Sequence, residues 1–89
     1  MDNIRLDNTF TFSVEPYNGK LRFVVSDQGK ESVCRIERKK TIESFLQARN
    51  SSIFKGRLQL HKLNNDIAVE VKGEVVGNVS VSSFQKLIS

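Results

Sequence analysis

One short amphipathic helix, predicted over Thr41–Arg49, divides this chain and most constrains how it folds. Its apolar residues recur at helical spacing and form one stripe: Ile42, Phe45 and Leu46. Thr41 suits the N-cap, Glu43 suits the positive end of the helix dipole, and Asn50 tolerates the left-handed conformation that ends helices. A helix of about two and a half turns does not persist alone in water. We therefore expect it to pack on the segments that flank it.

The segments before the helix alternate between apolar and polar residues, which is typical of half-buried β-strands. Strands are expected at residues 9–15, 21–26 and 32–37, with Asn18-Gly19 forming the first hairpin turn. Residues 1–8 are expected to form either a frayed arm or a short edge strand. This half of the chain thus predicts three strands followed by a helix.

The segments after the helix repeat this order. Strands are expected at residues 53–63 and 67–72, and Gly73 and Gly77 around Val75-Val76 indicate a turn and a bulged strand. Ser82 to Gln85 has the form of a capping box, which predicts a short C-terminal helix. Gly19–Phe23 aligns with Gly56–Leu60, and Ser44-Phe45 aligns with Ser83-Phe84.

Together these patterns predict a pseudo-repeated βββα-βββα arrangement. The expected fold class is α+β, a curved antiparallel sheet with two short helices on one face. The 89 residues are expected to form a single domain, residues 1–89, because the chain is long enough for one modest core. A second copy of the chain would be a natural supplement to so small a core.

Few residues in the chain have the chemistry of a catalytic or metal site. There is one histidine, His61, in a strand pattern with no acidic neighbour in sequence, so we expect a surface histidine and no enzyme activity. The one cysteine, Cys34, cannot form an internal disulfide and is expected to be a small buried residue in a reducing cytoplasm. No cofactor, metal or membrane-spanning segment is expected, and the N-terminal residues lack the order of a signal peptide.

Positive charge is concentrated in the middle of the chain. Residues 35–62 carry eight basic and two acidic side chains, whereas the other residues carry six basic and eight acidic ones. The basic residues of this segment are Arg35, Arg38, Lys39, Lys40, Arg49, Lys55, Arg57 and Lys62. Phosphate backbones attract such patches, because each neutralised phosphate releases condensed counterions. A solvated surface of a small soluble protein is the other interpretation of the same charges.

Two aromatic residues lie next to basic residues and glycines. Tyr17 is in the first hairpin turn and Phe54 precedes Lys55-Gly56-Arg57, whereas the other phenylalanines fit the core pattern. Single-strand-binding surfaces combine a basic groove with rings on which bases stack. We therefore expect Tyr17 and Phe54 to stack on bases, with Phe54 also compatible with the core. The expected phosphate contacts are Lys20, Arg22, Arg35, Lys55 and Arg57.

The first hairpin, Phe10 to Phe23, resembles the opening of a PUR repeat. Such repeats begin with an aromatic-rich strand, a polar turn and a Gly-basic-aromatic return strand, and close with a helix whose phenylalanine packs on the sheet. Gly19-Lys20-Leu21-Arg22-Phe23 and Ser44-Phe45 stand in those places. Family repeats place four strands before each helix, whereas three are expected here. The resemblance, shared with folds of the Whirly type, implies dimerisation through the helices and single-stranded DNA or RNA bound across the sheet.

These observations predict a non-enzymatic cytoplasmic module that binds single-stranded nucleic acid through a basic sheet face, as a homodimer. The alternative is a protein–protein interaction domain, an adaptor or an inhibitor, without nucleic-acid binding. In that case an exposed strand edge or the apolar residues of the C-terminal helix, Phe84, Leu87 and Ile88, would engage a partner chain.

Overall fold

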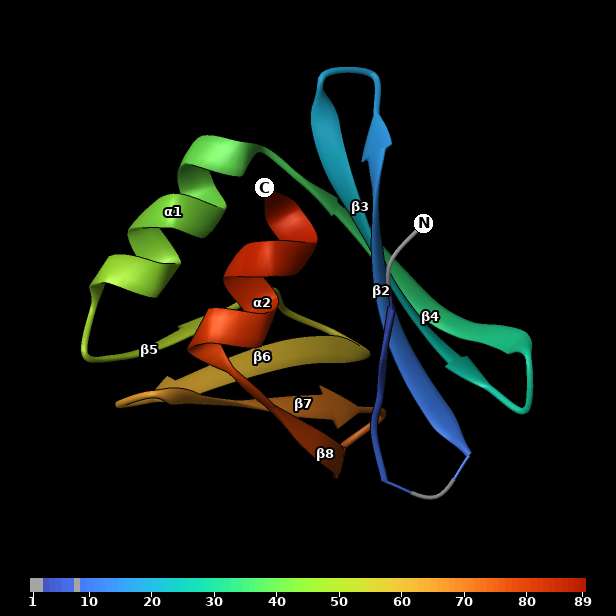
Figure 1. The fold of residues 1–89 in the computed structure, drawn as a ribbon. Coiled ribbons are helices and arrows are strands. Elements are labelled where there is room, and N and C mark those ends of the chain that lie inside the picture. Colours follow the sequence, from blue (N-terminus) through green and yellow to red (C-terminus); the bar gives the residue numbers. More distant parts are fainter. Residues whose placement is uncertain (1–2, 8) are drawn as a thin grey trace.

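The part of the chain that the structure describes folds into two antiparallel four-stranded sheets and two helices, so the α+β class is confirmed. The computed structural model describes residues 3–7 and 9–89 (Figure 1). Its elements are β1 (Asn3–Arg5), β2 (Phe10–Tyr17), β3 (Lys20–Asp27), β4 (Lys30–Glu37), α1 (Lys39–Gln47), β5 (Asn50–Ile53), β6 (Leu58–Leu63), β7 (Asp66–Val71), β8 (Glu74–Ser80) and α2 (Val81–Ile88). Sheet A has the order β1-β2-β3-β4 and sheet B the order β5-β6-β7-β8.

Each helix follows four strands, so the expectations of three strands per half and of one continuous sheet are wrong. In the first half the missed strand is β1, one of the two outcomes expected for residues 1–8; Met1, Asp2 and Asn8 of that segment lie outside the described residues. In the second half the missed strand is β5. β5 begins at Asn50, where the sequence predicts the end of the helix, and it shares only Ile53 with the strand expected at 53–63. Phe54 has a left-handed backbone, with φ +71°, and the rest of that expected strand does not begin until β6, at Leu58.

The sequence alignment of Gly19 with Gly56 matches turns that differ by one strand in their position within the two halves. Gly19 lies in the turn between β2 and β3, the second and third strands of its half. Gly56 lies between β5 and β6, the first and second strands of the other half. The turn that corresponds to Asn18-Gly19 by strand count is Asn64-Asn65, between β6 and β7. The two halves therefore share an order of elements, and the matched glycines occupy different places in it.

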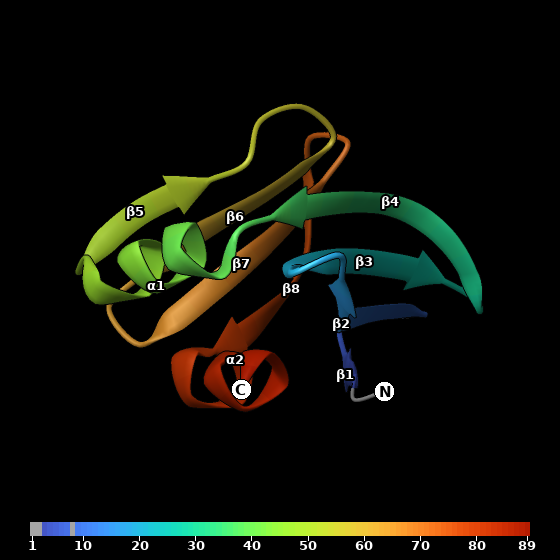
Figure 2. The ribbon, with the colours of Figure 1, turned by 90° about the horizontal axis from the view of Figure 1, so that it is seen from above.

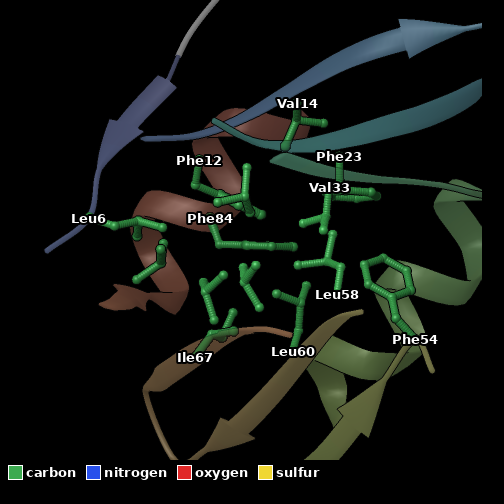
Figure 3. Close-up of a cluster of buried hydrophobic side chains, with 14 of the residues drawn as sticks. Leu6, Phe12, Val14, Phe23, Val33, Phe54, Leu58, Leu60, Ile67 and Phe84 are labelled. Carbon is green, nitrogen blue, oxygen red and sulfur yellow. The ribbon is translucent and has the colours of Figure 1, made fainter. Parts of the chain in front are cut away.

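Both helices lie over one face of sheet B, and sheet A stands beside it on the other side of α2 (Figures 1 and 2). The core lies between these layers and joins the two halves (Figure 3). At its centre the ring of Phe84, from α2, lies 5.9 Å from Phe12 and 6.0 Å from Phe23, which belong to sheet A. The same ring meets Phe45 of α1 edge-on at 6.4 Å. Phe12 and Phe23 are thus core residues, as the strand alternation predicts, and so are Phe45 and Phe84, as the helical spacing predicts.

The helix termini differ from the sequence prediction. Arg38 is the N-cap of α1 and makes no side-chain cap bond, so Thr41 is not the cap and Glu43 is outside the first turn. The oxygen of Ser80, not of Ser82, caps α2 by accepting a bond from the backbone N–H of Ser83 at 3.1 Å. Both predicted helices are therefore present, and their N-caps lie three residues (α1) and two residues (α2) before the positions that the capping signals indicate.

Lys62 holds the C-terminal end of α1. Its Nζ donates to the carbonyl of Ala48 at 2.6 Å and lies 3.4 Å from that of Arg49, and the residue is 8% exposed. The carbonyls at a helix C-terminus carry partial negative charge and need donors, so a cation is favourable there. Among the residues that the structure describes, Lys62 is the buried charged side chain, and it is unavailable to a partner in solution.

Gly77 lies at the predicted bulge in β8. The pairing of β7 with β8 shifts register between Val69 and Glu70, opposite this glycine. A Cβ atom added at Gly77 would lie 2.8 Å from the Cβ of Leu6 and 3.1 Å from the backbone nitrogen of Asp7. The N–H of Asp7 also donates to the carbonyl of Val76 at 3.1 Å. Glycine therefore lets the connection between β1 and β2 lie directly on β8.

Candidate nucleic-acid interface

A hollow of about 280 Å³ lies where β4 of sheet A meets the loop at residues 54–57, between β5 and β6 of sheet B. We call it the β4 groove. Its lining residues are Glu31, Ser32, Val33, Cys34, Arg35, Lys55, Arg57 and Leu58. Three of the seven predicted site residues meet here from the two halves of the chain: Arg35, Lys55 and Arg57. The salt bridges of the described residues involve Arg22 and His61, and none reaches these three cations.

The backbone of residues 54–57 is fixed at several points. Phe54 and Gly56 both have positive φ angles, of 71° and 89°, which turn the chain sharply between the two strands. The carbonyl of Gly56 accepts from the side chain of Gln59 at 3.1 Å, and the carbonyl of Arg57 accepts from the N–H of Lys72 at 2.7 Å. Arg35 donates to the carbonyl of Lys55 at 3.4 Å. The loop is thereby held against β4.

Phe54 is 9% exposed and belongs to the core, so the predicted stacking role for its ring does not fit the structure. One side of the ring packs against Phe23, with the two centroids 5.4 Å apart. The guanidinium carbon of Arg35 lies over the ring, 5.6 Å from its centroid. The positive φ of the loop carries the ring inward, which the basic and glycine neighbours in the sequence did not reveal.

Arg22 is bound to two carboxylates, which compete with the predicted phosphate contact. Its Nη1 lies 2.7 Å from Glu15 and its Nη2 lies 2.5 Å from Glu31, both on adjacent strands. The hydrogen bonds that Arg22 donates, first to Glu31 and then to Glu15, raise the pKa of Arg22, and the bond accepted from Arg22 holds the pKa of Glu31 below its ordinary value. Cross-strand partners of this kind depend on strand register, which the linear sequence does not show.

Tyr17 and Lys20 lie on the other face of sheet A from Arg35. They pair across the first hairpin, and residues of one strand alternate between faces, so Lys20 and Arg22 share a face that Phe23 does not. Phe23 pairs with Arg35, which places Arg35 on the core side. Tyr17 is 45% exposed, as expected. The seven predicted site residues therefore divide between two faces and do not form one wall.

Cys34 is exposed, so the expectation of a buried residue is wrong. It pairs with Val24 on β3 and lines the β4 groove beside Arg35. β4 is one of the two edge strands of sheet A, and its side chains are less covered than those of a central strand. The alternation around Cys34 predicts a strand correctly, but it does not identify an edge.

The other basic residues of the segment 35–62 lie apart from the groove. Arg38 and Lys40 line a second hollow of about 420 Å³ at the start of α1, together with Thr41 and Ser44. Lys62 is buried under the end of the same helix. The concentration of charge in the sequence thus becomes a basic groove, a basic helix start and one internal cation.

His61 has partners that sequence reasoning missed. Its Nδ1 lies 2.8 Å from the oxygen of Ser52 on β5, and its Nε2 lies 3.0 Å from a carboxylate oxygen of Glu70 on β7. The order serine, histidine, glutamate resembles a hydrolase triad, in which backbone N–H groups also face the developing oxyanion. Here the three residues lie within paired strands, and their side chains join β5, β6 and β7 across the outward face of sheet B. This chain of bonds stabilises the sheet register.

Within residues 3–7 and 9–89, no three His, Cys, Asp or Glu side chains gather as a metal-binding group. In the same part of the chain, no helix has the length and apolar character needed to cross a membrane. Comparison with protein-family models, with curated proteins and with solved structures found no match to this chain.

Proposed function

We propose that this protein binds single-stranded DNA or RNA, and that the β4 groove is where the strand lies. The observation that carries the proposal is the meeting of Arg35, Lys55 and Arg57, without carboxylate partners among the described residues, along one hollow of about 280 Å³. A cationic groove of this kind follows a phosphate backbone. The three side chains come from β4 and a fixed loop, so their spacing is set by the protein before any nucleic acid binds.

The order of elements supports the same proposal. The PUR repeats that the first hairpin resembles place four strands before each helix, and each helix of this chain also follows four strands. The interface proposed here differs from the one that the resemblance implies. It uses the groove between the two sheets, whereas Arg22 lies on the other face of sheet A, bound to Glu15 and to Glu31 at the rim of the groove. Tyr17 and Lys20 remain exposed on that face and are candidates for contacts beyond the groove.

The test is the salt dependence of binding to fluorescent oligo-dT and oligo-U, measured by anisotropy. Three phosphate contacts give a slope of about −2 in log affinity against log salt, which is about a 20-fold loss between about 50 and 200 mM salt. The double substitution Lys55→Ala with Arg57→Ala is expected to reduce that slope to about −0.7. The matched control is Lys39→Ala with Lys86→Ala, which removes the same charge from exposed helix positions and should leave the slope unchanged. Undetectable binding at low salt would exclude the proposal.

The protein-interaction alternative has one observation in its favour. An apolar hollow of about 460 Å³ beside the end of α2 is lined by Val14, Glu15, Pro16, Leu21, Leu87, Ile88 and Ser89. Phe84 and Ile88 are buried in the chain's own core, so only Leu87 of the three residues expected to engage a partner is partly accessible. Capture of a partner that survives nuclease treatment would support this alternative. The expected homodimer is tested on the same samples by sedimentation.

A further inference from the structure

We propose that the guanidinium of Arg35, supported by the ring of Phe54, is the platform on which one unpaired base of the bound strand stacks. The inference rests on the proposed function and assigns to Arg35 the stacking contact that the sequence predicts for Phe54. It gives the β4 groove a preference for strands whose bases are free, in addition to its attraction for phosphate.

The geometry around Arg35 carries this inference. Its guanidinium carbon lies over the Phe54 ring at 5.6 Å from the centroid, and its Nη1 donates to the carbonyl of Lys55 at 3.4 Å. The ring and the carbonyl together define the position of the planar group. Arg35 is exposed although Phe54 beneath it is buried, so the side of the guanidinium away from the ring is open to the groove. Arginine planes stack on aromatic faces in this manner, and nucleobases are such faces.

The backbone of Phe54 indicates why the ring is there. A bulky residue with φ of +71° is uncommon, and such conformations persist only where the surroundings hold them. Here the ring is held by Phe23 at 5.4 Å on one side. The result of this conformation is that the ring supports Arg35 while the next residues, Lys55 and Arg57, line the same groove. One platform and two further cations are thus adjacent.

This arrangement distinguishes a single strand from a duplex. Bases within a duplex are already stacked and paired, whereas a single strand can turn a base onto the guanidinium. Every base has a π-face, so the contact tolerates any sequence. The proposed ligand is therefore an unpaired stretch of nucleic acid with its bases intact, and a bare sugar–phosphate chain should bind more weakly.

The test uses Arg35→Lys, which keeps the positive charge and removes the plane. The probes are oligo-dT and an abasic oligonucleotide of the same length, at one fixed low salt concentration. The wild-type chain should bind oligo-dT about tenfold more tightly than the abasic strand, and Arg35→Lys should lose most of that difference without weakening abasic binding. The control, Arg57→Lys, makes the same change of side chain in the same groove and should keep the preference for oligo-dT. A strand with one 2-aminopurine should change its fluorescence when it binds the wild-type chain, because the base leaves its neighbours in the strand, and should change less with Arg35→Lys.

The outcomes separate the inference from the proposed function. Equal affinity of the wild-type chain for both probes would overturn the stacking inference and leave phosphate binding in place. An equal loss for both probes in Arg35→Lys would also overturn it, because Arg35 would then contact phosphate alone. Failure of the wild-type chain to bind either probe would exclude the proposed function itself.

Discussion

Replacing Lys62 with methionine should lower the stability of the fold without changing oligonucleotide binding, although Lys62 belongs to the basic segment 35–62. Methionine fills a similar volume beside the core but has no donor for the carbonyls of Ala48 and Arg49, which Lys62 now contacts at 2.6 and 3.4 Å. A hydrogen bond from a charged donor contributes about 1.5–3 kcal/mol, and an orphaned buried carbonyl costs a comparable amount. The removal of a buried charge offsets part of this loss. We expect the free energy of unfolding to fall by about 1–2 kcal/mol.

Urea and thermal unfolding measure this effect directly. A loss of about 1–2 kcal/mol in a domain of this size lowers the melting temperature by about 5–15 °C. The control is Lys86→Met on α2, which removes an exposed lysine and should change stability by less than about 0.5 kcal/mol. Oligonucleotide affinity of Lys62→Met should stay at the wild-type value, although a charge of the segment 35–62 is lost. Stability equal to or above that of the wild-type chain would refute the reasoning, since desolvation would then outweigh the two bonds.

Two further substitutions test the groove and the packing of the two sheets. Glu31→Gln removes a carboxylate that lines the groove and holds Arg22, so the affinity for oligo-dT at low salt should rise about threefold. The control, Glu43→Gln on α1, should leave the affinity for oligo-dT unchanged. Arg22 lowers the pKa of Glu31, so the stabilisation from this pair is present above the ordinary pKa of glutamate. It is lost as the pH falls through the lowered pKa of Glu31. Because Glu31→Gln removes this titrating group, it should flatten the decline of the free energy of unfolding in acid. Gly77→Ala places a methyl group 2.8 Å from the Cβ of Leu6 and should lower the free energy of unfolding by about 1–3 kcal/mol, measured by thermal unfolding. A melting temperature equal to that of the wild-type chain would show that the β1–β2 connection moves away freely.

The parts of the fold that the sequence predicts are those set by local patterns. Alternation identifies β2, β3, β4 and β7, and the Asn18-Gly19 turn adopts the expected positive φ angles of 50° and 78°. The bulge at Gly77 is also confirmed. β1 and β5 are short edge strands of three and four residues, too brief to show a reliable alternation. A left-handed phenylalanine such as Phe54 has no sequence signature, so the break between β5 and β6 could not be predicted.

The site residues show the same division between local and long-range information. Lys55 and Arg57 are adjacent in sequence and remain together, and the groove adds Arg35 from twenty residues earlier because β4 lies against their loop. Arg22 has Glu15 and Glu31 as partners because strand pairing brings these two carboxylates to it. His61 similarly acquires Glu70 from the next strand. The sequence therefore identifies the basic residues, whereas strand register determines which of them have carboxylate partners.

The position of Phe84 predicts that the two halves of the chain unfold together. This one ring meets Phe12 and Phe23 in the first sheet and Phe45 in the first helix, although it belongs to the last helix described. A fragment that ends before α2 would lack Phe84, and the apolar side chains that pack against this ring would be exposed to water. Calorimetry should accordingly record a single cooperative transition, and damage at the far end of either sheet should be felt across the whole molecule.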